Sequence, residues 1–166
     1  MELRIAEPDD ASNVTALLER SYPSLMAASY DANVLAVALP EMTRANPALL
    51  ASETYYVMED GERLIGCGGW TAEKPGSGEV EPGLAHLRHF ATDPDRSREG
   101  IGRAIYNRCA TDALNRGLTR FQAFSGLNAE PFYARLGLER VRVIDVPMGP
   151  SANLPTVLME GPVRPV

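Results

Sequence analysis

The chain has 166 residues, of which 45% are hydrophobic, and its formal net charge is −6. This length and composition are typical of one globular domain with a real core, so we expect a single domain over residues 1–166. The acidic balance argues against a dedicated nucleic-acid binder, which needs a basic face. No apolar run approaches the roughly 20 residues that cross a membrane, and the first residues lack the apolar core of a signal peptide. We therefore expect a cytoplasmic protein without a membrane or nucleic-acid partner.

The first half of the chain alternates strand and helix signals. We expect Pro40 to end the second helix, because proline disrupts a helix interior. Asp60-Gly61 is a turn signal between two runs of aromatic and aliphatic residues, which predicts an antiparallel hairpin. The expected elements are a strand over 2–6, a helix that begins at 8–10, helices over 32–39 and 47–50, and strands over 54–59 and 64–71.

The second half continues this pattern after a loop over 72–83 that is rich in glycine and proline. Asn128 is placed to cap a helix, because its side chain can accept from the first backbone amides. The expected elements are a strand over 84–92, a helix over 100–116, a strand over 118–124, a helix over 129–136, and two last strands around a proline-rich loop at 147–155. Hairpins at both ends favour an α/β (α+β) fold with a mixed, mostly antiparallel sheet covered by helices.

The segment from Phe90 to Ile105 runs from a strand through a basic, glycine-bearing loop into a helix. The first turn of a helix has unpaired amides and the positive end of the helix dipole, so it can bind phosphate. Gly100 and Gly102 allow close approach, and Arg96, Arg98 and Arg103 add positive charge. The sequence lacks the Gly-Lys-Ser or Gly-Lys-Thr of a Walker loop, and Ile105 replaces the third glycine of a dinucleotide fingerprint.

A second segment, Ser125–Leu138, contains Asn128, Phe132-Tyr133 and Leu136-Gly137. Together with the loop over 98–102, this segment resembles the GCN5-related N-acetyltransferase (GNAT) superfamily, over roughly residues 84 to 140. The chain departs from the family pattern at two positions. Ser97 stands where the family usually has Gln or Arg, and Leu138 follows Gly137 where the family usually has Phe.

The resemblance implies a sheet of about six or seven strands that splay apart at an acetyl-CoA site, where the pantetheine arm pairs like a further strand. It also implies that acetyl-CoA is the acyl donor, with no metal, and that a small-molecule or peptide amine is the acceptor. A homodimer is left open. The implied cofactor-binding residues are Phe90, Ala91, Thr92, Arg98, Glu99, Gly100, Ile101, Gly102, Arg103 and Asn128.

Acetyl transfer to an amine needs an oxyanion site, a proton for the departing thiolate and a base. The resemblance implies that Tyr133 is the acid and that amides near Phe90–Thr92 stabilise the oxyanion. Strand alternation predicts that His86, Arg88, Phe90 and Thr92 share one face. His86 is the candidate base, because imidazole titrates in the useful range, with a water chain as the alternative.

The cysteines and the aromatic residues of the first half have no assigned part in the transfer step. Cys67 and Cys109 are expected in the core, without metal-ligand spacing around either histidine. Aromatic candidates for the acceptor pocket are Tyr22, Tyr30, Tyr55, Tyr56 and Trp70, although any single one of them is more typical of a core residue. Two alternatives to N-acetylation remain: a catalytically silent acyl-CoA-binding module with the same fold, and transfer to oxygen or of a longer acyl chain.

Overall fold

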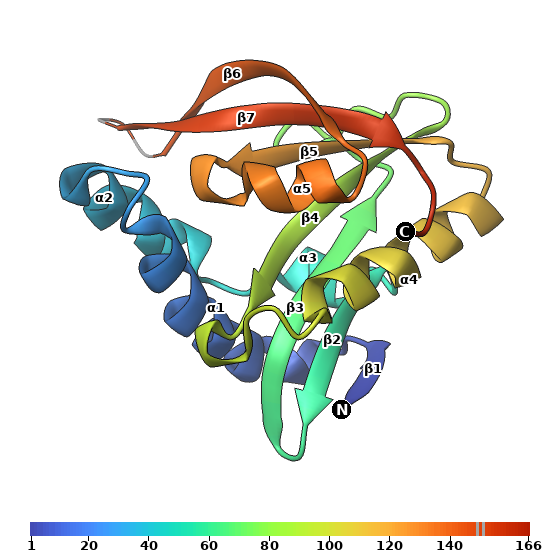
Figure 1. Ribbon diagram of the computed structural model, residues 1–166, viewed down its shortest axis with the longest axis horizontal. Coiled ribbons are helices and arrows are strands. Elements are labelled where there is room, and N and C mark those ends of the chain that lie inside the picture. The colour runs from blue at the N-terminus through green and yellow to red at the C-terminus, as the bar shows by residue number, and fades with distance from the viewer. Residues whose placement is uncertain (149, 151) are drawn as a thin grey trace.

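The computed structural model describes residues 1–148, 150 and 152–166, and its centre is a seven-stranded sheet (Figure 1). The strand order is β1-β2-β3-β4-β5-β7-β6, and every neighbouring pair is antiparallel except β4 and β5. The mixed, mostly antiparallel sheet is therefore confirmed. The strands are β1 (Glu2–Ile5), β2 (Tyr55–Asp60), β3 (Arg63–Thr71), β4 (Leu84–Thr92), β5 (Arg120–Gly126), β6 (Glu139–Pro147) and β7 (Asn153–Pro162).

Helices cover both faces of this sheet. The α-helices are α1 (Ala11–Met26), α2 (Ala32–Met42), α3 (Pro47–Leu50), α4 (Ile101–Asn115) and α5 (Glu130–Arg135). Short 3-10 turns are η1 (Pro8–Asp10), η2 (Pro94–Arg96) and η3 (Leu127–Ala129). Helices α4 and α5 bury apolar residues in one core cluster with the sheet, whereas α1 and α3 pack into a second cluster and α2 into a third. Apolar burial on both faces holds the sheet between two helical layers.

Strands β4 and β5 pair over a short distance and then separate (Figure 1). Their parallel pairing runs from Leu84 opposite Arg120 to His86 opposite Gln122. Beyond His86, β4 remains paired with β3 alone, and β5 remains paired with β7. The expected splay is confirmed, and it leaves one edge of each strand without a backbone partner.

A β-bulge interrupts β4 just where it leaves β5. The pairing register shifts opposite Cys67–Gly69, and His89 adopts a left-handed φ of +54°. An extra residue in a strand reverses the alternation of faces beyond it. The prediction that Phe90 shares a face with His86 is therefore wrong, because Phe90 packs with Leu87 against the same core cluster.

Some expected boundaries are also wrong. Pro40 lies inside α2, which continues to Met42. The amide and the hydroxyl of Thr43 both donate to the Leu39 carbonyl oxygen, at 3.0 and 2.7 Å, so the last turn is closed although Pro40 has no amide proton. The expected loop at 147–155 is shorter, because β6 reaches Pro147 and β7 starts at Asn153. Residues 149 and 151 of that loop lie outside the described residues.

Both cysteines are buried, as predicted. Cys67 lies on β3 and Cys109 on α4, and each is sealed from solvent as a free thiol. Burial raises the pKa of the Cys67 thiol to about 12, so this side chain stays protonated at neutral pH. The two cysteines are therefore unreactive core residues.

Candidate active site

A cavity of about 850 Å³ lies where β4 and β5 separate, and we refer to it as the splay cavity. We call the part of the lining that comes from the loop after β4, the start of α4 and α5 the loop arm. The rest of the lining comes from α1, α2, the β4 bulge and the end of β5, and we call it the second arm. The lining residues are Ser21, Tyr22, Leu25, Met26, Met42, Leu87, His89, Phe90, Ala91, Thr92, Asp93, Pro94, Arg96, Ser97, Arg98, Gly100, Ile101, Gly102, Arg103, Phe124, Gly126, Asn128, Ala129, Phe132, Tyr133 and Arg135.

The loop arm presents a row of free backbone amides. The backbone amides from Ser97 to Arg103 donate to no acceptor among the described residues. The first backbone hydrogen bond of α4 is donated by the Ala104 amide to the Gly100 carbonyl oxygen, at 2.9 Å. Arg98 and Gly100 are both left-handed, with φ of +67° and +78°. Successive amides around left-handed residues form a concave site for anions, and the dipole of α4 adds to it.

The arginines of this arm differ in what they contact. Arg96 is paired with Asp60 at 2.8 Å and with Glu99 at 2.9 Å, so its charge is largely balanced. Glu99 does not line the splay cavity. Arg98 and Arg135 form none of the ion pairs found among the described residues. Sequence reasoning missed Arg135, although it stands two residues after Tyr133 in the same short helix.

A buried aspartate anchors the start of the loop. Asp93 is 1% exposed and accepts from Arg63 at 2.6 Å, from Arg20 at 3.4 Å and from the Asp95 amide at 3.1 Å. Burial alone would raise the pKa of Asp93, but the Asp95 amide and the two arginines hold it below its ordinary value. The carboxylate thus fixes the first residues after β4 and with them the direction of the loop.

Asn128 does not cap a helix, contrary to the prediction. It lies inside η3, and the residue at the N-cap of α5 is Ala129, which makes no side-chain cap bond. The Asn128 Oδ1 atom is buried without a hydrogen-bond partner among the described residues, and Asn128 lines the splay cavity. An orphaned buried acceptor costs about 1–3 kcal/mol, so a donor on a bound ligand would be favoured there.

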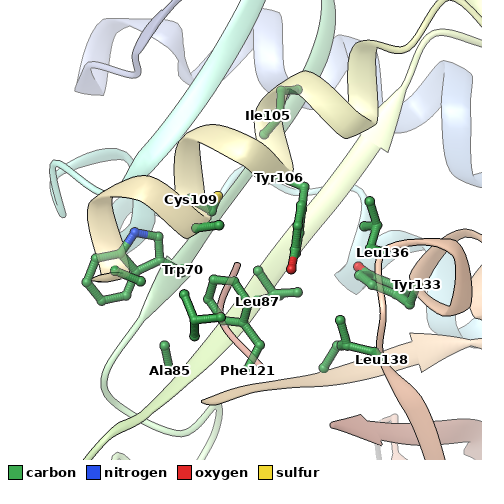
Figure 2. Packing of buried hydrophobic residues seen from close by; sticks show 14 of the residues in the cluster. Trp70, Ala85, Leu87, Ile105, Tyr106, Cys109, Phe121, Tyr133, Leu136 and Leu138 are labelled. Atoms are coloured by element: carbon green, nitrogen blue, oxygen red, sulfur yellow. The ribbon is translucent and has the colours of Figure 1, made fainter. Parts of the chain in front are cut away.

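Tyr133 is buried on α5 at the edge of the core cluster, near Leu136 and Leu138 (Figure 2). Its ring packs edge-on against Phe132 and Phe90, with centroids 5.1 and 6.3 Å away. The Tyr133 hydroxyl bonds to no described residue, and Tyr133 lines the splay cavity. Burial raises the pKa of Tyr133 well above its ordinary value, which keeps the phenol protonated and able to donate at neutral pH.

The second arm of the splay cavity is mainly apolar. Leu25, Met26, Met42 and Phe124 contribute its aliphatic and aromatic surface. Tyr22 also lines it, and its hydroxyl donates to the Phe90 carbonyl oxygen at 3.0 Å. This arm therefore suits an apolar group.

The two histidines of β4 lie in different places. His86 lines a separate pocket of about 420 Å³ with Lys74, Glu79 and Gln122, and its Nδ1 is buried without a partner among the described residues. His89 lines the splay cavity. His89, and not His86, therefore lines the same cavity as Tyr133.

Of the five aromatic residues expected around the acceptor, only Tyr22 lines the splay cavity. Tyr30 donates to the Pro155 carbonyl oxygen at 2.6 Å, and Tyr55 donates to the His89 carbonyl oxygen at 2.9 Å. The Tyr56 hydroxyl contacts the Asp112 carboxylate, and the guanidinium of Arg116, at the C-cap of α4, lies over the Trp70 ring. The hydroxyls of the three tyrosines are therefore bonded within the fold, whereas Trp70 Nε1 is buried without a partner among the described residues.

The comparison with protein families decides the classification. The model of the acetyltransferase (GNAT) family matches residues 14–138. The chain belongs to the acetyltransferase (GNAT) family. The matched GNAT region contains the β4 bulge, the loop with free amides and Tyr133, and family membership supports acetyl transfer as the general chemistry. No curated protein matches the chain in sequence.

Solved GNAT structures share this fold at low sequence identity. A GCN5-related N-acetyltransferase from Rhodopseudomonas palustris has a TM-score of 0.77 and 18% identity, covering 97% of this chain and 94% of that chain. The PaiA N-acetyltransferase of Thermoplasma acidophilum, in complex with coenzyme A, has a TM-score of 0.69 and 13% identity, covering 97% and 98%. The ribosomal-protein-S18-alanine N-acetyltransferase of Escherichia coli has a TM-score of 0.64 and 15% identity, covering 98% and 93%.

Among the described residues, no helix combines the length and the apolar character that a bilayer crossing requires.

Proposed function

We propose that the chain is an acetyl-CoA-dependent N-acetyltransferase that moves the acetyl group to a primary amine of a small molecule or peptide by direct attack. The observation that carries this proposal is that one cavity joins the free amides of Ser97–Arg103 to the protonated phenol of Tyr133. One extended ligand could therefore place a diphosphate against these amides and a thioester beside the Tyr133 hydroxyl. The coenzyme A complex of the similar PaiA enzyme supports this ligand.

The loop arm would hold the diphosphate. Its amides and the uncompensated charges of Arg98 and Arg135 match an anion, although the chain as a whole is acidic. The amide-bearing pantetheine arm would pass along the splay and donate to Asn128 Oδ1. The proposed cofactor-binding residues are Phe90, Ala91, Thr92, Arg98, Gly100, Ile101, Gly102, Arg103 and Asn128, while Glu99 supports the loop through Arg96.

The proposed chemistry uses groups of β4 and α5 that line the cavity. The edge of β4 beyond His86 is unpaired on the β5 side, so amides near Phe90–Thr92 are available to the oxyanion of the attacked thioester. Tyr133 would donate its proton to the sulfur as the carbon–sulfur bond breaks. The apolar arm would receive the acceptor, which favours an amine that carries a hydrophobic substituent.

Two measurements together test the proposal. Calorimetry with coenzyme A should show binding, and a panel of apolar and cationic primary amines with acetyl-CoA should release free thiol with at least one amine. Binding without any thiol release would support the silent acyl-CoA-binding module instead. Absence of both would contradict acyl-CoA binding as well as acetyl transfer. Mass spectrometry of the product would separate acetylation at nitrogen from acetylation at oxygen, and longer acyl-CoA donors would test the acyl length.

A further inference from the structure

We propose that His89 is the general base of this reaction, and that its Nδ1 atom takes the proton from the acceptor amine. This inference rests on the proposed function. It departs from the expectation that His86 is the base, because His86 lies in a separate pocket and His89 lies in the cavity with Tyr133.

The hydrogen bonding of His89 fixes which ring nitrogen carries the proton. His89 Nε2 lies 2.8 Å from the Met42 carbonyl oxygen, at the end of α2. A carbonyl oxygen only accepts, so Nε2 is the protonated nitrogen and Nδ1 of the neutral ring has the free lone pair. Nδ1 has no hydrogen-bond partner among the described residues and is not sealed from solvent, and His89 lines the splay cavity.

The bulge holds this imidazole in place. At φ +54° the His89 side chain leaves the regular alternation of β4, and its carbonyl oxygen accepts from the Tyr55 hydroxyl at 2.9 Å. The thiol of Cys67 lies 3.7 Å from the same oxygen. Strained backbone of this kind persists only where surrounding contacts determine it, and it is concentrated at functional sites. The bulge thus fixes the backbone of His89, and the Met42 carbonyl oxygen at the end of α2 fixes its ring.

The surroundings favour the neutral, proton-accepting form. Burial lowers the pKa of His89, the Met42 carbonyl opposes this, and the charge of Arg88 lowers the pKa further. The other titratable groups that face His89 are Tyr22, whose ring centroid lies 5.8 Å away, and the side chains of Tyr55 and Cys67, all protonated at neutral pH. A neutral imidazole beside an apolar acceptor arm is a competent base.

The proton balance closes without a further reactant. The amine nitrogen forms a bond to the thioester carbon, and its proton passes to His89 Nδ1. The carbon–sulfur bond then breaks, and the sulfur takes the proton of Tyr133 to give the free thiol of coenzyme A. The imidazolium and the phenolate that remain return to their starting forms when one proton passes from His89 to Tyr133 through water. An acceptor that enters as ammonium first loses one additional proton to solvent.

The kinetic test compares His89→Asn with His86→Asn. Asparagine tolerates the left-handed conformation, so His89→Asn should fold and bind coenzyme A with unchanged affinity. We expect His89→Asn to lower kcat by about 10²–10⁴-fold, and His86→Asn to leave it close to the wild type. Loss of activity in His86→Asn with retention in His89→Asn would overturn the assignment. Absence of wild-type turnover with every amine would instead contradict the proposed function.

A pH profile gives a readout that a purely structural role would not change. At saturating acceptor, the wild-type kcat should fall as pH drops through a pKa below the usual histidine value of about 6.5, because the base must be unprotonated. This limb should be absent in His89→Asn. An identical limb in the variant would overturn the assignment.

Nitrogen-15 NMR of the imidazole rings tests the inference independently of turnover. For His89 at pH 7 we expect the neutral tautomer with the proton on Nε2, as the bond to Met42 requires. A protonated ring, or a proton on Nδ1, would overturn the proposal even if no acceptor were known.

Discussion

Gly102 lies directly against Phe132: a Cβ atom added to Gly102 would come within 2.9 Å of Phe132 Cε2. Gly102 is in the first turn of α4, which presents the free amides, and Phe132 precedes Tyr133 on α5. The missing side chain therefore sets the distance between the proposed diphosphate site and the proposed acid. A glycine here is required by close approach, whereas the glycine at position 100 is required by its φ of +78°.

Gly102→Ala should weaken both stability and coenzyme A binding, because overpacking costs about 1–3 kcal/mol and displaces Phe132. Thermal unfolding and calorimetry would measure the two effects. The double variant Gly102→Ala/Phe132→Leu should recover part of the stability, since the shorter side chain leaves room. A double-mutant cycle with no coupling between positions 102 and 132 would contradict the proposed contact.

Tyr133→Phe should lower kcat by about 10²–10⁴-fold, because the sulfur then leaves without a proton. The affinity for coenzyme A should stay nearly constant, since the ring still packs against Phe90 and Phe132 and the hydroxyl bonds to no described residue. Steady-state kinetics and calorimetry on the same preparation would measure both. Unchanged turnover would remove Tyr133 from the mechanism.

Arg98→Gln should raise the dissociation constant of coenzyme A about tenfold or more, because a hydrogen bond to a charged group contributes about 1.5–3 kcal/mol. Added salt should weaken wild-type binding more than binding by the variant. Arg44→Gln is the matched control, because Arg44 is exposed, pairs with Glu41 and does not line the splay cavity. Equal affinities of the two variants would show that Arg98 does not contact the phosphates.

Asp93→Asn should destabilise the fold by about 1–3 kcal/mol, since it removes a buried charged acceptor from Arg63 and Arg20. The pKa of Asp93 is lowered in the folded protein. Its carboxylate therefore stabilises the fold fully above the pKa that Asp93 has in the unfolded chain, and this stabilisation is lost as pH falls through the pKa of the folded state. Chemical denaturation should thus show a gap between wild type and variant at pH 6 that narrows toward pH 2. A gap independent of pH would show that the charge of Asp93 does not stabilise the fold.

The sequence predicted the elements whose signals are local. The strand over 84–92, the loop that follows it and the helix that ends before Gly117 depend on apolar periodicity and on glycine, and all three are confirmed. The prediction that Asn128 caps a helix is wrong. It used the local preference of asparagine for caps, whereas the 3-10 turn that contains Asn128 depends on contacts such as the bond from the Leu127 amide to the Tyr30 hydroxyl.

The bulge at His89 could not be predicted from β4 alone, because it depends on how β4 pairs with β3. A signal existed in β3, where the sequence Gly66-Cys67-Gly68-Gly69 interrupts a buried strand. Glycine in a strand interior marks a bulge or a close approach. In the structure a Cβ at Gly68 would lie 2.7 Å from Phe90 Cγ, so this glycine makes room for the ring that the bulge turns toward α5.

Titration of coenzyme A into nitrogen-15-labelled protein tests the central claim most directly, because it observes the free amides themselves. We predict that the amides from Ser97 to Arg103 shift most, that Asn128 and Tyr133 shift with them, and that His86 and Gln122 in the separate pocket do not. Saturating coenzyme A that leaves the amides of Ser97–Arg103 unmoved, or that shifts mainly the pocket of His86, would contradict the account.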